Sequence, residues 1–217
     1  MDKQKTLGAI LFDDFELLDL YGPLEMFGNL GPELKIVTIA EQAGPIRSAQ
    51  GPSTLAEYCF GSAPILDFVL VPGGYGTFEQ AQNSAMLEFL TTRALGAEGV
   101  MSVCSGSGVL AGAGLLDGRK ATTNKLFFSA ITEESSQVDW QKNARWVEDG
   151  NVFTSSGVSA GTDMSLAVIA KHYGVDRAHG VARMTEYDWQ MDPNKDNFSQ
   201  FIDQGNLGEY LELLGKT

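Results

Sequence analysis

The sequence predicts an α/β fold, a doubly wound and mostly parallel sheet sandwiched by helices, and three observations support this. Apolar strand-like runs alternate with helix-like segments along the chain. Residues 65–71 are apolar at nearly every position, as in a central parallel strand buried on both faces. Residues 99–104 pass through a turn of small residues directly into a helix-like segment. With 217 residues and no linker, we expect a single domain covering residues 1–217.

The remaining elements of the first half follow from periodicity and proline placement. Residues 6–12 are predicted as the first strand, and residues 34–40 alternate as the second. Pro23 predicts the start of a helix, because proline is well tolerated in the first helical turn. Residues 79–95 have a helical pattern and follow the central strand.

The second half continues the alternation. Residues 105–116 predict a helix with four glycines, and we expect close packing against the sheet to offset their cost of about 1 kcal/mol each. Residues 146–154 predict a hairpin around an Asp-Gly turn. Residues 162–173 are apolar on nearly every side and stop at a glycine, as in a buried, capped helix. Apolar residues at helical spacing over 198–214 predict an amphipathic pair of C-terminal helices.

Composition narrows the function classes. A net charge of -13 argues against nucleic acid or an anionic membrane surface as a partner. The N-terminus has no apolar signal core and no run is long enough to span a bilayer, so a cytoplasmic location is expected. We expect Cys59 and Cys104 to be reduced thiols. The two histidines, His172 and His179, are too few for a His-rich metal centre, and no metal is expected.

Cys104 is the most informative residue of the chain, because the strand–turn–helix pattern around it is typical of a nucleophile elbow. In an elbow the turn lifts the side chain above the sheet, and the helix N-terminus offers N–H donors that favour a thiolate. In doubly wound sheets ligands bind beyond the carboxyl ends of the strands, so Gly73, Gly74 and Cys104 are predicted on one rim. The alternative is that Cys104 is a small buried hydrophobic residue that ends a core strand.

Four separated motifs resemble the ThiJ/PfpI superfamily, which has a flavodoxin-like, class I glutamine amidotransferase-like fold. They are the segments 18–23, 72–74, 101–123 and 157–163, and the resemblance covers about residues 6 to 190 in the same order. Within the superfamily the chain is most similar to isonitrile (isocyanide) hydratases. Relatives include amidase-like domains of transcription regulators.

The resemblance implies roles for four residues. Cys104 would be the nucleophile, the backbone N–H groups of Gly74 and Ser105 would form a small anion hole, and a side chain at Gly74 would crowd the approach. Asp19 would lie beside the thiol as a carboxylic acid kept neutral by desolvation, and thus as a general acid. The alternative for Asp19 is capping of the helix near Pro23.

The resemblance further implies a small-molecule pocket bounded by Gly73, Tyr75, Thr123 and Val158. Hydroxyl side chains over residues 154–162 are better explained by a tight strand-to-helix connection than by ligand contact. No metal or organic cofactor is required, because a thiol, an acid and water are sufficient for hydration of an isonitrile to an N-substituted formamide.

The chain departs from the family pattern at two places. Ser105 stands where the protease and amidase branches have histidine, which disfavours a Cys-His mechanism. Asn124 and Lys125 stand where relatives commonly have His-Trp, so the pocket or its substrate is expected to differ.

The alternatives to the hydratase are an amidase, glyoxalase-like or deglycase-like enzyme, a redox sensor with a low-pKa Cys104, and a regulatory domain without catalysis. The chain ends at Thr217 without an appended helix-turn-helix, which weakens the last of these.

A homodimer is also implied by the resemblance. The superfamily commonly pairs around the first helix and the elbow. Tyr21, Met26 and Phe27 are predicted to present an apolar surface beside Asp19 that a partner would cover.

Overall fold

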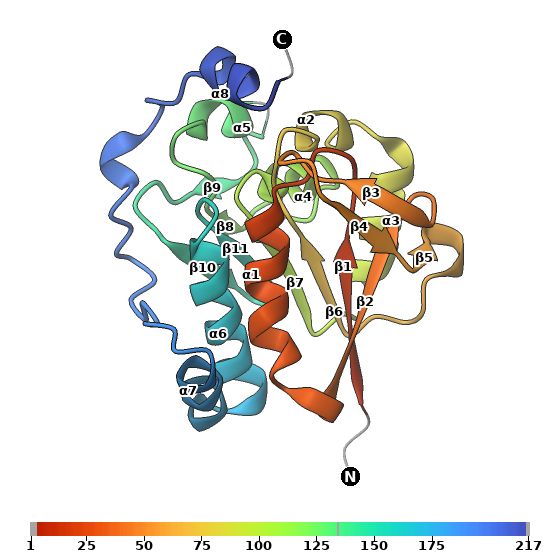
Figure 1. The fold of residues 1–217 in the computed structure, drawn as a ribbon. Helices are drawn as coiled ribbons and strands as arrows, with labels where there is room; N and C mark the ends of the chain where they lie inside the picture. The colour runs from red at the N-terminus through yellow and green to blue at the C-terminus, as the bar shows by residue number, and fades with distance from the viewer. Residues whose placement is uncertain (1–3, 134, 216–217) are drawn as a thin grey trace.

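The computed structural model describes residues 4–133 and 135–215, and a seven-stranded sheet forms its centre (Figure 1). All neighbouring strands in it are parallel except one antiparallel pair at the edge formed by residues 146–149 and 152–155, which confirms the predicted fold class. In sheet order the strands are β10 (Trp146–Asp149), β11 (Val152–Ser155), β7 (Gly99–Val103), β6 (Phe68–Val71), β1 (Lys5–Ile10), β2 (Leu34–Ala40) and β5 (Tyr58–Cys59).

Helices cover both faces of the sheet (Figure 1). On one face lie α1 (Leu17–Gly28), α6 (Ala160–Tyr173) and α7 (Val175–Met184), and on the other α3 (Ser84–Ala94) and α4 (Gly106–Gly112), with α2 (Thr77–Gln80) beside α4. The smaller elements are β3 (Gly44–Arg47), β4 (Ser53–Ala56), β8 (Lys120–Ala121), β9 (Asp139–Trp140), α5 (Phe128–Thr132), α8 (Leu207–Leu213) and 3-10 turns at Gly31–Glu33, Phe60–Ser62 and Ser199–Phe201.

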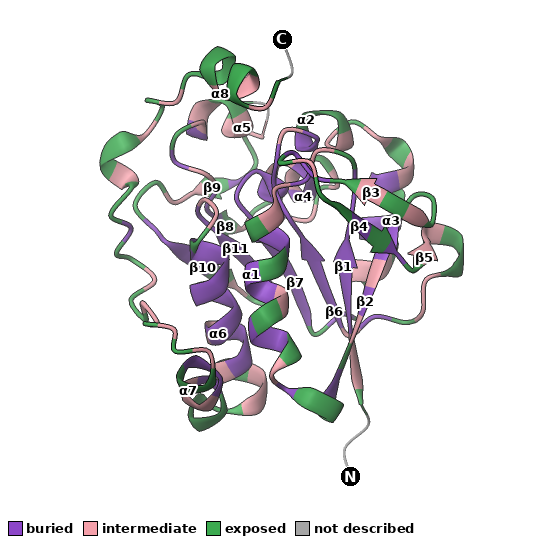
Figure 2. Ribbon diagram, viewed as in Figure 1, coloured by how far each residue is buried: buried purple, intermediate pink, exposed green. Residues whose placement is uncertain are grey.

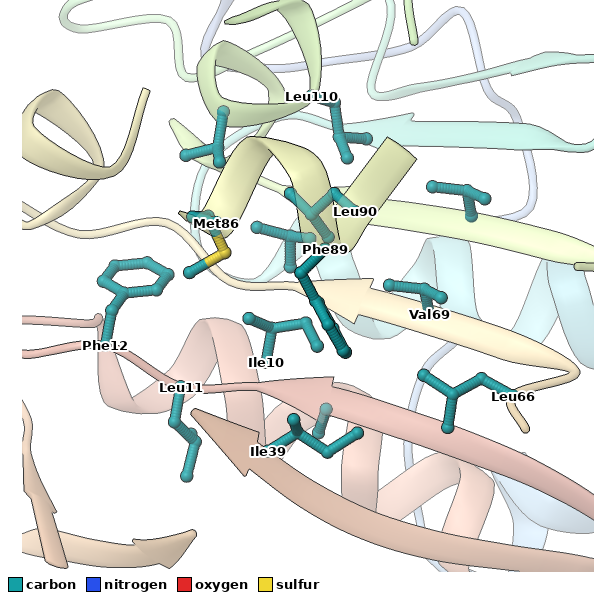
Figure 3. Packing of buried hydrophobic residues seen from close by; sticks show 14 of the residues in the cluster. Ile10, Leu11, Phe12, Ile39, Leu66, Val69, Met86, Phe89, Leu90 and Leu110 are labelled. Atoms are coloured by element: carbon teal, nitrogen blue, oxygen red, sulfur yellow. The ribbon is translucent and has the colours of Figure 1, made fainter. Parts of the chain in front are cut away.

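Strand β6 shows why the sheet needs a layer of helices on each of its two faces. Its four residues are all buried, and they alternate between the two sides as a strand must. Phe68 and Leu70 pack into the core under α1 and α6, whereas Val69 and Val71 pack into the core under α3 and α4. Figure 2 shows the three central strands β6, β7 and β11 buried along their whole length, and Figure 3 shows Phe89 of α3 on the same side of the sheet as Val69.

Helix α1 begins earlier than predicted. It starts at Leu17, so Pro23 lies inside the helix rather than at its start, and that prediction is wrong. The reason is tertiary: the Glu16 N–H donates to the carbonyl oxygen of Gly73 at 2.8 Å, which fixes the helix start against the sheet rim. The predicted interface surface is also partly wrong, because Met26 and Phe27 are buried in the chain's own core and Tyr21 alone of the three is exposed.

Two other helical predictions were too long. The predicted helix at 79–95 is divided, because Asn83 caps α3 by accepting a hydrogen bond from the Ala85 N–H at 3.0 Å. The glycine-rich helix ends at Gly112, and the close packing expected for it is confirmed at Gly106, where a Cβ would lie 2.7 Å from the carbonyl oxygen of Pro72. Of the predicted C-terminal helix pair, only α8 is an α-helix.

The hairpin and the capped helix are confirmed. Strands β10 and β11 pair in an antiparallel register around Gly150. Helix α6 ends at Tyr173 and is followed by the C-cap residue Gly174, whose φ is 96°. In the part of the chain that the structure describes, no helix is long and apolar enough to cross a bilayer. After α7 the chain returns along the side of the molecule, so that α8 lies beyond the end of the sheet at which the parallel strands finish (Figure 1).

Candidate active site

Cys104 occupies the elbow that the sequence predicts. It follows β7 directly and has a φ of 55°, a left-handed conformation that is uncommon for a residue with a side chain. Its N–H is shared between the carbonyl oxygens of Ser155 and Ser156, both at 3.2 Å. Its carbonyl oxygen accepts from the hydroxyls of Thr123 at 2.9 Å and Ser107 at 3.0 Å. These bonds hold the strained backbone in place and direct the thiol toward the rim.

The glycine loop after β6 meets the elbow at the same rim, as predicted. A Cβ on Gly73 would lie 2.6 Å from Asp19 Oδ2 and 2.8 Å from Cys104 Cβ. Gly74 has a φ of 118°, and a Cβ on it would collide with the Asp14 carbonyl oxygen. Both glycines are therefore required by the packing of this chain itself, rather than by the approach of a substrate.

Asp19 lies beside Cys104, on the first turn of α1, and is fully buried. Its Oδ2 accepts a hydrogen bond from the Gly73 N–H at 2.9 Å. Its Oδ1 is buried without an ordinary hydrogen-bond partner among the described residues, and the Cys104 thiol is close enough to affect its pKa. Asp19 thus binds the glycine loop and not an N–H of its own helix, so the capping alternative is wrong.

The Asp19–Cys104 pair retains protons more strongly than either group would in water. Burial raises the pKa of Asp19 well above its ordinary value, and the nearby Glu16 carboxylate raises it further. Burial and the Asp19 charge raise the pKa of the Cys104 thiol, although hydrogen bonds from Asn124 and the Ser105 N–H oppose this. The short helix α4 therefore does not outweigh burial, and the expected low thiol pKa is not what this environment favours. The two groups share at least one proton near neutral pH.

Asn124 is a site residue that sequence reasoning did not assign. Its Nδ2 donates to Cys104 Sγ at 3.1 Å, and its Oδ1 accepts from the Phe127 N–H at 3.1 Å, which fixes the orientation of the amide. A Cβ on Gly157 would lie 2.7 Å from Asn124 Nδ2, so the opposite wall also confines it. The sequence did contain a feature that could have identified this residue, since Asn124 is one of the two positions that depart from the family pattern.

Ser105 and Gly74 are joined by their own hydrogen bond. The Gly74 N–H donates to Ser105 Oγ at 3.1 Å, while the Ser105 N–H lies near the Cys104 sulfur. One of the two predicted anion-hole donors is thus directed at the thiol, and the other is directed at a hydroxyl. The anion hole as a whole stays a prediction.

A cavity of about 410 Å³ opens above Cys104. Of the residues predicted to bound it, Tyr75 and Val158 do so, together with Gly74 and Ser105. Gly73, Thr123 and Asp19 lie behind this surface, and the Thr123 hydroxyl is directed at the elbow backbone. The other lining residues are Glu16, Phe78, Asn124, Leu126, Phe127, Ile131, Gln204, Gly205, Asn206, Leu207, Glu209, Tyr210 and Leu213.

The last seven of these come from the C-terminal segment, which forms a roof that sequence reasoning missed. The Tyr210 hydroxyl donates to Glu16 Oε2 at 3.1 Å, and its ring centroid lies 5.9 Å from that of Phe127. Burial, together with the charge of Glu16, raises the pKa of Tyr210, so this hydroxyl stays protonated and remains a donor. No local pattern could have revealed a contact between residues 194 positions apart.

Lys125, the second position that departs from the family pattern, lies beneath the site. Its side chain is almost completely buried, with Nζ donating to Thr122 Oγ1 at 2.6 Å and to the Ala144 carbonyl oxygen at 2.8 Å. Nζ is 3.8 Å from Asp196 Oδ2, in the segment that leads to the roof. Lys125 is therefore a buried anchor for that segment.

Neither histidine contributes to the cavity, as expected. His172 lies against the rings of Phe68 and Phe153, and His179 against Trp189. Among the described residues no group of His, Cys, Asp and Glu side chains is arranged to hold a metal ion. Both cysteines are free thiols, as predicted.

A cysteine on a strained elbow, with a buried acid beside it at the carboxyl end of a parallel sheet, defines an α/β protein of the nucleophile-elbow class. The chain belongs to the DJ-1/PfpI family, whose model matches residues 5–171. It is 34% identical over 181 residues to isonitrile hydratase of Pseudomonas putida, covering 83% of this chain and 78% of that protein.

Three further comparisons show how diverse the similar proteins are. The HTH-type transcriptional regulator GbdR of Pseudomonas aeruginosa is 30% identical over 189 residues, which cover 85% of this chain but 51% of the regulator. A ThiJ/PfpI family protein from Pseudomonas syringae has a similar structure, with a TM-score of 0.81 at 30% identity, covering 98% of this chain and 86% of that one. Drosophila melanogaster DJ-1beta shares the fold, with a TM-score of 0.77 at 18% identity over 86% of this chain and 100% of that one.

Proposed function

We propose that this protein hydrates isonitriles to N-substituted formamides, with Cys104 as nucleophile and Asp19 as general acid. The observation that carries this proposal is the buried Asp19–Cys104 pair, which holds a proton beside a thiol at the floor of a mostly apolar cavity. The similarity to a protein named isonitrile hydratase supports the same activity.

The first half of the proposed reaction uses the shared proton. An isonitrile, R–N≡C, has no leaving group, so reaction at its terminal carbon requires a nucleophile and a proton on the same atom. Cys104 Sγ forms the new C–S bond while the proton held by the pair is delivered to that carbon through Asp19, giving the thioimidate R–N=CH–S–Cys104. Asp19 is left as a carboxylate.

The second half consumes water. Water adds across the C=N bond, its oxygen to carbon and a proton to nitrogen, and in this proposal the Asp19 carboxylate passes that proton. The adduct R–NH–CH(OH)–S–Cys104 then breaks its C–S bond to release R–NH–CHO, and the hydroxyl proton returns to the pair. Hydrogen bonds from Asn124 and the Ser105 N–H stabilise the sulfur as it leaves.

Two alternatives are less well supported by the same contacts. An amidase must protonate a leaving amine, and no histidine lines the cavity. A thiol that senses oxidants is typically accessible and of low pKa, whereas Cys104 is 8% exposed and burial raises its pKa.

The test is product analysis. The protein is incubated with benzyl isonitrile at pH 7, and N-benzylformamide is measured by mass spectrometry against a heat-inactivated control. Catalytic turnover well beyond one equivalent of protein is expected. Absence of formamide from a range of alkyl and aryl isonitriles would contradict the proposed function.

We also propose a homodimer, on the basis of family resemblance and the exposed apolar side chains of Leu18 and Tyr21 on α1. Sedimentation at micromolar concentration is expected to give a dimer. A stable monomer would remove this proposal without affecting the chemistry.

A further inference from the structure

The walls of the cavity are apolar and aromatic. The rings of Tyr75 and Phe78 lie 5.9 Å apart on one side, and Leu126, Phe127 and Ile131 form another. The volume of about 410 Å³ is in the range of sites that bind drug-sized molecules. A substrate such as methyl isonitrile would leave most of this apolar surface uncovered, so the shape favours a bulky substituent.

The roof adds apolar surface opposite the thiol. Leu207, Tyr210 and Leu213 of α8 all line the cavity, and the Tyr210–Glu16 hydrogen bond joins the roof to the start of α1. A substituent on an isonitrile carbon bound to Cys104 would extend from the floor toward these side chains.

The charges at the cavity have a single sign. Glu16 and Glu209 line it, whereas no lysine, arginine or histidine among the described residues does. Glu16 Oε2 accepts hydrogen bonds from Gln50 Nε2 at 2.8 Å and from Tyr210, both uncharged donors. In the described part of the chain, neither glutamate forms an ion pair. A bound anion would meet two carboxylates and no compensating cation.

Building on the proposed function, we propose that the substrates are isonitriles with a bulky apolar substituent that is neutral or basic, and that Glu16 and Glu209 exclude substituents bearing a carboxylate or phosphate. The carboxylates select by repulsion, since a like charge in a partly desolvated cavity is opposed strongly. The aromatic walls and α8 favour bulky apolar substituents, because such substituents bury more apolar surface on binding.

The first test does not depend on turnover. Iodoacetamide and iodoacetate are similar in size and both alkylate thiolates, but only iodoacetate is anionic. The ratio of their rates at one thiol cancels that thiol's ionised fraction. Cys59 lies outside the cavity and serves as the internal reference. We expect the iodoacetamide-to-iodoacetate ratio at Cys104 to exceed that at Cys59 by at least about tenfold, as followed by peptide mass spectrometry.

Matched variants test whether the cavity carboxylates cause the difference in the iodoacetamide-to-iodoacetate ratio between Cys104 and Cys59. Glu209→Gln and Glu16→Gln are expected to lower the ratio at Cys104 severalfold each. Glu212→Gln removes the same charge from the same helix. Both glutamates are exposed, but Glu212 does not line the cavity, so the ratio is expected to stay the same. Equal ratios at Cys104 and Cys59, or an equal response to Glu209→Gln and Glu212→Gln, would overturn the proposed anion exclusion.

The second test uses substrates. Ethyl isocyanoacetate and its free carboxylate share the reacting group, and we expect kcat/KM to be at least about tenfold higher for the ester. Benzyl isonitrile is expected to exceed methyl isonitrile by a similar factor. Hydration of all four at equal rates would overturn the inference and leave the proposed function intact. Failure to hydrate any of them, with the alkylation ratio as predicted, would overturn the hydratase and leave the charge selection standing.

Discussion

The floor and the roof of the cavity are built in different ways. The floor consists of Cys104, Asp19 and the loop of Gly73 and Gly74, whose atoms are buried and in mutual contact. The roof, residues 204–213, is mostly exposed and joins the rest of the chain through a few side chains, such as Tyr210 on Glu16. The floor can therefore determine the chemistry, while the roof determines which molecules reach it.

The difference extends to how each region is held. At the floor, five hydrogen bonds fix the strained Cys104 backbone, and a Cβ on either glycine would collide with neighbouring atoms. The residue just before the roof, Asp203, accepts hydrogen bonds from the Ser129 N–H at 2.7 Å and the Ser129 hydroxyl at 2.6 Å, both near the surface. Substitutions at the floor are therefore expected to change rate constants strongly, and those at the roof to change selectivity.

The largest effect is expected from removal of the nucleophile. Cys104→Ala should reduce formamide formation by at least about 10⁴-fold, because no other thiol lines the cavity. The matched control is Cys59→Ser on the edge strand β5, which should retain full turnover. Full activity in Cys104→Ala, or a comparable loss in Cys59→Ser, would show that the floor is not the reacting centre.

Asp19→Asn should have the next largest effect. The amide cannot transfer a proton, and turnover should fall about 10²–10⁴-fold, the usual contribution of a general acid. The fold and the Gly73 hydrogen bond should be kept, as should alkylation of Cys104 by iodoacetamide. Asp19→Glu should be more active than Asp19→Asn. If Asp19→Asn turns over substrate at the wild-type rate, Asp19 is not the general acid and only contributes to the packing of the site.

Asn124→Ala should have an intermediate effect. It removes the side-chain donor that is 3.1 Å from Cys104 Sγ, and a loss of about 10–100-fold in kcat is expected. Because Asn124 lowers the thiol pKa, the pH profile of Cys104 alkylation should move to higher pH in the variant. A change in KM alone, with the alkylation profile unmoved, would mean that Asn124 only shapes the cavity.

The smallest effect concerns the anchor between floor and roof. Burial lowers the pKa of Lys125 from 10.5 to about 8, although Asp196 opposes the shift. Between these two pH values the unfolded chain binds more protons at Lys125 than the folded protein, so this group makes the free energy of unfolding rise with pH. From pH 7 to pH 10, wild type should gain stability relative to Lys125→Met by on the order of 1–3 kcal/mol.

Urea unfolding of both proteins at the two pH values measures this difference, in which the titration of all other groups cancels. Lys125→Met should also be the less stable protein at pH 7, since it leaves Thr122 Oγ1 and Asp196 without their buried partner. A difference that is independent of pH would show that Lys125 is not titrating in this range.

Much of the fold was predictable because its signals are local. The elbow at Cys104 and the cap at Gly174 each depend on a few neighbouring residues, and both are confirmed. The buried strand predicted at 65–71 is confirmed over Phe68–Val71, but its predicted start is wrong, because Ile65 is exposed. The start of α1 was missed because it depends on a hydrogen bond to Gly73, more than fifty positions away. Asn83 broke the predicted helix at 79–95 through a cap that competes with helix continuation.

The site residues also differ in whether local sequence or distant contacts determine their position. Asp19, Cys104 and Ser105 were predicted beside one another and lie so, whereas Thr123 was expected in the pocket and instead supports the elbow from behind. The roof could not be predicted, because its position on Phe127 and Glu16 results from the return of the chain after α7.

The most direct test of the central claim is to trap the covalent intermediate. The protein is mixed with benzyl isonitrile, quenched in acid within milliseconds to seconds, and digested for peptide mass spectrometry. Because the isonitrile adds without a leaving group, we expect a mass gain of one whole isonitrile on the peptide containing Cys104, rising and then falling as N-benzylformamide accumulates. Formamide production at the wild-type rate by Cys104→Ala, or an adduct confined to Cys59, would contradict it.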